Sequence, residues 1–187
     1  RPHPVLRTEK MKSNFAKSFS LMLQSEGGFS DNPADAGNHL PDGRAGCTNL
    51  GVTQTAWEEY VGHKVSTQDM RDLTPATVMD FYKRRYWDTV KGDALPNALD
   101  YLAFDMAVNS GPGRSIKLMQ RAVDVTEDGY LGPLTMQALS VWSIRQLIDK
   151  FSNTKADFYK SLNNATFQKG WLNRVEHTKA NALEMLS

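Results

Sequence analysis

Cysteine and histidine are scarce in this chain of 187 residues. The single cysteine, Cys47, excludes an internal disulfide and the zinc sites built from several cysteines. The four histidines have no spacing typical of metal ligands, so we expect no dedicated metal site. The longest apolar run is far shorter than the ~20 residues that cross a bilayer, so we expect no stable membrane insertion. Arg1–Lys12 is basic but lacks an apolar core after it, so we expect neither a signal peptide nor an anchor there.

Net charge is also small. The 22 Lys and Arg residues against 21 Asp and Glu residues leave a formal charge of +1, which does not favour a nucleic-acid partner. Hydrophobic residues make up 40% and charged residues 23%, close to the globular average, so a disordered or fibrous chain is excluded. The length fits one domain with a sizeable core.

Helical periodicity dominates most of the chain. An apolar stripe of Phe15, Phe19, Met22 and Leu23 predicts a first helix over Asn14–Ser25. The clearest core helix is expected at Pro96–Asn109, and another long one at Pro75–Thr89, with Thr74 as its cap. The other predicted helices are Thr55–Val61, Thr67–Asp72, Arg114–Val123, Pro133–Val141, Ile144–Asn163 and Phe167–Leu186.

One segment interrupts the helices. Phe29–Thr53 is rich in Gly, Pro, Asp and Asn, which indicates loops and tight turns, with room for a short hairpin near Phe29-Ser30 and Leu50-Gly51-Val52. The predicted fold class is therefore mainly α, with a small loop-rich or β-hairpin insertion after the first long helix.

Two carboxylates are the strongest candidates for chemistry. Glu26 follows Phe15 by eleven residues, which places it on the buried stripe at the end of the first helix, where desolvation favours the protonated acid. Asp35 lies nine residues further on, across a turn-rich loop, and suits the second carboxylate of a glycoside hydrolase. Spacing alone is equally compatible with a frayed helix-end charge and a turn residue. A thiol nucleophile at Cys47, paired with His39 or His63, lacks any recognisable signature.

Several sequence blocks resemble one enzyme family. The blocks Glu26-Gly27-Gly28-Phe29, Asp31-Asn32-Pro33-Ala34-Asp35 and Thr48-Asn49-Leu50-Gly51-Val52-Thr53 are similar to the signature of glycoside hydrolase family 108. These enzymes are N-acetylmuramidases, mostly endolysins of phages and prophages. Further similar blocks follow in the same order at Asp72–Thr74, Tyr82–Trp87, Phe104–Gly111 and Asp128–Thr135, the last resembling the peptidoglycan-binding segment that accompanies this family. The likeness covers most of residues 15–175.

The resemblance implies a single lysozyme-like domain over residues 13–187, after a flexible N-terminus at 1–12. Muramidase motifs would occupy about 13–100, and a peptidoglycan-binding-like helical region about 101–175. The implied reaction is hydrolysis of the β-1,4 bond between N-acetylmuramic acid and N-acetylglucosamine, without a cofactor. The implied partner is bacterial peptidoglycan, and the protein would act as a monomer. It would accumulate in the host cytoplasm and reach the wall in the periplasm after release.

The resemblance also assigns residue roles. Glu26 matches the catalytic glutamate and is the expected general acid, while Asp35 would orient or activate water that Thr48 helps to hold. Candidate substrate contacts are Trp57, Tyr60, Tyr86 and Asn109, although aromatic residues at helical spacing are also typical of a core.

The sequence departs from the family pattern at one place. The usual Asp-Pro-Gly-Gly-x-Thr is replaced by Asp35-Ala36-Gly37, an extra stretch at 38–46, and then Cys47-Thr48. This insertion makes Asp42 a rival second carboxylate. Two other functions stay open from the sequence: a non-catalytic peptidoglycan-binding or secretion-related protein, and a lytic transglycosylase.

Overall fold

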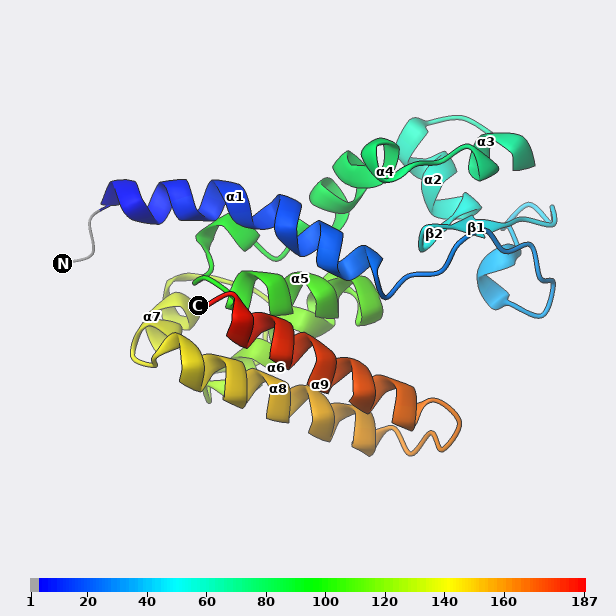
Figure 1. Ribbon diagram of the computed structural model, residues 1–187. Coiled ribbons are helices and arrows are strands. Elements are labelled where there is room, and N and C mark those ends of the chain that lie inside the picture. Colours follow the sequence, from blue (N-terminus) through cyan, green and yellow to red (C-terminus); the bar gives the residue numbers. More distant parts are fainter. Residues whose placement is uncertain (1–3) are drawn as a thin grey trace. The chain divides into compact units, whose positions relative to one another are not determined.

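The computed structural model of the protein describes residues 4–187, with side chains from Asn14 onward. The fold is mainly α and lysozyme-like, with one small hairpin, as predicted (Figure 1). The helices are α1 Pro4–Leu23, α2 Gln54–Val61, α3 Thr67–Arg71, α4 Pro75–Tyr82, α5 Leu99–Ser110, α6 Pro112–Ala122, α7 Pro133–Ser140, α8 Ile144–Ser161 and α9 Gln168–Glu184. The strands are β1 Thr48–Asn49 and β2 Val52–Thr53, and shorter helical turns are η1 Ala36–Asn38, η2 Lys83–Trp87 and η3 Gly92–Ala94.

The chain divides into two compact units. The smaller unit is Phe19–Arg84, and the larger consists of the residues up to Ser18 together with Arg85–Ser187. This division falls earlier in the sequence than the expected change of region near residue 100, and the single domain over 13–187 stays a prediction. Of the expected flexible terminus at 1–12, residues 1–3 lie outside the described residues, whereas Pro4 already begins α1.

Helix α5 forms the centre of the larger unit. Every residue from Leu99 to Ala107 is buried, because α6, α8 and α9 all pack against this helix. Two buried carboxylates on α5 are satisfied by side chains from elsewhere in the unit. Asn14 donates to Asp100 at 2.8 Å, and the Arg174 guanidinium donates to both oxygens of Asp105 at 2.9 and 3.1 Å.

Helices α8 and α9 lie side by side (Figure 1). A lysine is buried between them. Lys155 of α8 is only 2% exposed, and its Nζ lies 3.5 Å from the hydroxyl oxygen of Thr178 on α9. The ammonium also lies 5.0 Å from the centre of the Phe151 ring. Burial lowers the pKa of Lys155 to about 8.

The smaller unit is built around aromatic rings and the hairpin. Strands β1 and β2 pair antiparallel, with Thr48 opposite Thr53 and Asn49 opposite Val52. The two turn residues, Leu50 and Gly51, both have positive φ angles of 52° and 77°, the requirement of a two-residue hairpin turn that matches strand twist. The predicted hairpin is therefore present. On the other edge of β1, Thr48 forms an antiparallel bridge with Ser30, in the segment that follows Glu26.

Several helix boundaries differ from the sequence prediction, including those of the first helix, which was predicted over Asn14–Ser25 and runs from Pro4 to Leu23. The helix predicted over Pro75–Thr89 is α-helical only to Tyr82 and continues as the π-helical turn η2. The core helix predicted from Pro96 begins at Leu99, because Ala98 has a φ of 73° and cannot be part of a right-handed helix. Within residues 4–187, no helix has the length and apolar character needed to cross a membrane.

Candidate active site

Glu26 lies just beyond the end of α1 and reaches the hairpin turn. Its backbone N–H donates to the carbonyl of Leu23 at 3.1 Å, which closes the turn that ends the helix. A Cβ atom placed on Gly51 would stand 2.8 Å from Oε2 of Glu26 and 2.6 Å from the hydroxyl oxygen of Tyr82. Non-bonded atoms do not approach this closely, and the φ angle of Gly51 is also positive, so only glycine fits at this position. The carboxyl group of Glu26 therefore lies directly against the turn.

Asp35 and Thr48 meet at a second glycine. Asp35 caps the short helix η1, with its Oδ1 accepting from the N–H of Gly37 at 3.0 Å. A Cβ atom on Gly37 would lie 3.4 Å from this oxygen and 3.9 Å from Oγ1 of Thr48, which comes from β1. The structure thus brings together two side chains that are separated in sequence by the inserted loop.

Asn38 holds this arrangement in place and was missed by sequence reasoning. Its side chain is 2% exposed. The amide nitrogen donates to the carbonyl of Asn32 at 2.9 Å, and the amide oxygen accepts the hydroxyl of Thr48 at 2.7 Å. Asn38 therefore ties the loop that carries Asp35 to β1. An asparagine in a polar insertion gives no sequence signal for burial, so this role could be found only from the structure.

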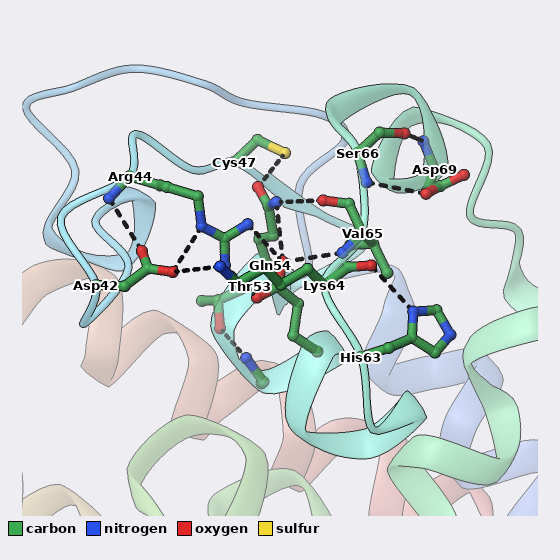
Figure 2. A network of polar contacts seen from close by, with 12 residues as sticks. Asp42, Arg44, Cys47, Thr53, Gln54, His63, Lys64, Val65, Ser66 and Asp69 are labelled. Atoms are coloured by element: carbon green, nitrogen blue, oxygen red, sulfur yellow. Dashed lines mark hydrogen bonds and ion pairs between the residues drawn. The ribbon is translucent and has the colours of Figure 1, made fainter.

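Asp42 belongs to a different network, on the inserted loop (Figure 2). Its Oδ2 lies 2.7 Å from Nε of Arg44 and 3.8 Å from Nζ of Lys64. Hydrogen bonds from the backbone and side chain of Arg44 hold the pKa of Asp42 below its usual range. Asp35, in contrast, has no cationic partner among the described residues. The pairing of Asp42 gives it a structural role in the loop.

The same arginine joins the loop to α2. Two nitrogens of Arg44 donate to the two carboxylate oxygens of Glu58 at 3.0 and 2.6 Å. This fork lowers the pKa of Glu58 to about 2, and the N–H of Val65 donates to the same carboxylate at 3.0 Å. The inserted loop is therefore anchored, with Leu40 buried beneath it.

An open cavity of about 390 Å³ lies between this loop and α2. Its charged lining includes Asp42, Arg44 and Glu58, which are already engaged with one another. None of the three predicted catalytic side chains lines it. The cavity is thus bordered by the loop network and is separate from the two glycine positions described above.

Cys47 is buried and pairs with an amide. Its thiol is 1% exposed, and Sγ lies 3.5 Å from Oε1 of Gln54 (Figure 2). Burial raises the pKa of this thiol, which disfavours the reactive thiolate. His39 and His63 instead contact the carbonyls of Pro33 and Lys64. The geometry therefore gives no support to a cysteine–histidine nucleophile.

The predicted substrate contacts fall in both units. In the smaller unit, Trp57 is 7% exposed and its ring packs 5.1 Å from that of Tyr60, which is 36% exposed. In the larger unit, Tyr86 is half-buried in η2, and the amide of Asn109 donates to the hydroxyl of Tyr159. Their part in substrate binding stays a prediction.

Among the described side chains, no three His, Cys, Asp or Glu residues are placed together so that they could hold a metal ion. Two positions of the smaller unit carry groups suited to acid–base chemistry: the turn, with the Glu26 carboxyl, and Gly37, with Asp35 and Thr48.

The chain is similar to a known enzyme family and to a solved structure. Residues 19–111, which include the whole smaller unit, match the family described as Glycosyl hydrolase 108. The solved structure of SagA from Brucella abortus is similar to this chain, with a TM-score of 0.78 and 34% sequence identity over 93% of this chain and 96% of that chain. A search of curated proteins gave no match. Because a family match over the site-bearing unit coincides with a similar structure along nearly the whole length, the chain belongs to the glycosyl hydrolase 108 family and is a peptidoglycan-degrading glycosidase.

Proposed function

We propose that this protein is a lysozyme-type muramidase. It hydrolyses the β-1,4 bond between N-acetylmuramic acid and N-acetylglucosamine in bacterial peptidoglycan. The observation that carries the proposal is the placement of one carboxyl, that of Glu26, against the hairpin turn, with a second carboxylate and a hydroxyl gathered at the other end of the same hairpin. Glycoside hydrolysis needs two such groups in different surroundings.

The surroundings of the three side chains support a separate role for each. Glu26 gives its proton to the glycosidic oxygen as the bond from that oxygen to the anomeric carbon breaks. Asp35 is exposed, and among the described residues only its Oδ1 accepts a hydrogen bond, so its other oxygen can accept a proton from the attacking water. The hydroxyl of Thr48 donates its hydrogen bond to the side-chain oxygen of Asn38. The lone pairs of Oγ1 therefore stay available to accept a hydrogen bond from the same water. Water is consumed, and one new reducing end forms for each bond cleaved.

The decisive experiment compares the wild type with Glu26→Gln on purified peptidoglycan. The variant keeps the shape of the side chain but cannot act as the acid, so release of reducing ends should fall by at least about 100-fold. Glu176→Gln, an exposed change on α9, serves as the matched control and should keep the wild-type rate. Full activity of Glu26→Gln would contradict the assigned mechanism, and an inactive wild type would favour a non-catalytic wall-binding protein.

Product analysis separates hydrolysis from lytic transglycosylation. A hydrolase adds water to each product pair, whereas a transglycosylase forms anhydro ends without water. The Asp35–Thr48 pair supports the hydrolase, because a transglycosylase has no use for a water-holding site. Mass spectrometry should therefore find the hydrated products, and anhydro ends as the main product would overturn this choice.

We further propose the cellular role of an endolysin that acts as a monomer. It would accumulate in the host cytoplasm and degrade the wall after a separate factor opens the membrane. The resemblance of the site motifs to phage enzymes supports this role. Expression inside bacteria should leave cells intact until a membrane-permeabilising agent is added, and should then cause lysis. Lysis without that agent would contradict the release step.

A further inference from the structure

Two residues without an assigned role border the carboxyl of Glu26. They are Gly51, in the hairpin turn, and Tyr82, the last residue of α4. The hydroxyl oxygen of Tyr82 and Oε2 of Glu26 lie 2.6 and 2.8 Å from the same point, the place where a Cβ atom on Gly51 would stand. The tyrosine hydroxyl and the glutamate carboxyl therefore flank one backbone position.

Tyr82 is held firmly by the core of the smaller unit. It is 1% exposed, and its ring centre lies 5.6 Å from that of Phe19 and 5.3 Å from that of Phe81. Its hydroxyl donates to the carbonyl of Leu50 at 2.7 Å. Leu50 has a φ of 52°, a conformation that costs a residue with a side chain some strain. The hydrogen bond from Tyr82 thus helps to hold the turn in this conformation.

We propose that Tyr82 is a positioning residue for the general acid. Its hydroxyl holds the Leu50-Gly51 turn against Glu26 and so confines the carboxyl to the place from which it delivers its proton. The inference rests on the proposed role of Glu26. Such confinement matters because a displacement of about 1 Å of a reacting group can slow a reaction by about 100-fold.

The first test is Tyr82→Phe, which keeps the packed ring and removes only the hydroxyl. The maximal rate of reducing-end release should fall about 10- to 100-fold, while the half-saturating peptidoglycan concentration stays unchanged. The matched control is Tyr101→Phe, since Tyr101 is also 1% exposed and its hydroxyl oxygen also takes part in a hydrogen bond, from the amide of Asn181 at 3.1 Å. The control should keep the wild-type rate. Circular dichroism and thermal unfolding check that both variants are folded at the assay temperature.

The second test is a double-mutant cycle with Gly51→Ala. In the wild-type background, the new methyl group collides with the Tyr82 hydroxyl and with Glu26, so activity should be lost. In the Tyr82→Phe background, the collision at 2.6 Å disappears, and the same substitution should reduce the rate by a smaller factor. This cycle tests whether the Tyr82 hydroxyl stands against Gly51, whereas the positioning role itself is tested by the maximal rate of Tyr82→Phe.

The outcomes distinguish this inference from the proposed function. A wild-type rate for Tyr82→Phe, or a change only in the half-saturating concentration, overturns the positioning role. An equal effect of Gly51→Ala in both backgrounds contradicts the placement of the Tyr82 hydroxyl against the turn, and the positioning role falls with that placement. An active Glu26→Gln, however, refutes the assignment of the general acid itself, whatever Tyr82→Phe shows.

Discussion

The burial of Lys155 in the larger unit predicts how the stability of the protein depends on pH. Its pKa of about 8, compared with 10.5 for an ordinary lysine, means that the folded protein binds this proton less tightly than the unfolded chain. The difference corresponds to about 3 kcal/mol in favour of unfolding at pH 7. Stability should therefore rise with pH between about 8 and 10.5, as the folded state no longer has to hold a buried ammonium.

Replacement of Lys155 by Met should remove this penalty. Methionine has nearly the same length and flexibility, so it can fill the space between Phe151 and Thr178. Asp105 keeps its two hydrogen bonds from Arg174 in the variant. At pH 7 we expect Lys155→Met to be more stable than the wild type by up to about 3 kcal/mol, and at pH 9.5 by only about 1 kcal/mol.

Urea unfolding followed by tryptophan fluorescence at the two pH values measures this gap. Lys160→Met, an exposed change on the same helix, is the control and should shift stability by no more than about 0.5 kcal/mol at either pH. Two results would refute the reasoning. One is a Lys155→Met variant that is less stable than the wild type at pH 7, and the other is a gap that does not shrink on going to pH 9.5.

Three further predictions concern the smaller unit. Asp35→Ala should abolish most reducing-end release whereas Asp42→Ala should keep it, and the reverse result would transfer the role of second carboxylate to Asp42. Asn38→Ala should lower the free energy of unfolding by about 1–3 kcal/mol in urea unfolding, because it removes the hydrogen bonds of Asn38 with the carbonyl of Asn32 and the hydroxyl of Thr48, and it should also slow catalysis. Arg44→Gln should make the protein less stable than the wild type at pH 7. The difference should shrink as pH falls from 4.5 to 2, because the pKa of Glu58 is about 2 in the folded protein and the stabilising charge of this carboxylate is lost over that range. Acid titration of both proteins by circular dichroism measures this difference, and a gap independent of pH would contradict it.

The helices could be predicted from the sequence because their apolar residues repeat with a clear period. The stripe of α5, from Leu99 through Met106, is an example, and Thr74 with Pro75 marked the start of α4 correctly. The predicted boundaries of α4 and α5 were wrong where the backbone adopts a conformation that the sequence does not indicate. Nothing in the sequence around Ala98 indicates a positive φ, and no local pattern separates the α-helix that ends at Tyr82 from the π-helical turn after it.

The site could be predicted only in part, for a physical reason. Glu26, Asp35 and Thr48 were predicted from helix periodicity and family motifs, which are local in sequence, and their catalytic roles stay a prediction. The contacts that hold them are not local: Tyr82 reaches a carbonyl 32 residues away, and Asn38 binds Thr48 across the insertion. Which of Asp35 and Asp42 lies near Thr48 depends on the path of the inserted loop. The two hydrogen bonds from Arg44 to Glu58 anchor that path.

The division of the chain has a consequence for the order of folding during synthesis. The smaller unit is one continuous stretch, complete once Arg84 has left the ribosome, whereas the larger unit begins before it and ends at the last residue. Domains generally fold as soon as their sequence is available. The residues up to Ser18 must therefore wait for partners such as Asp100, while the part that contains Glu26, Asp35 and Thr48 can form first. The proposed catalytic groups would thus be assembled before helices α5 to α9 have been made.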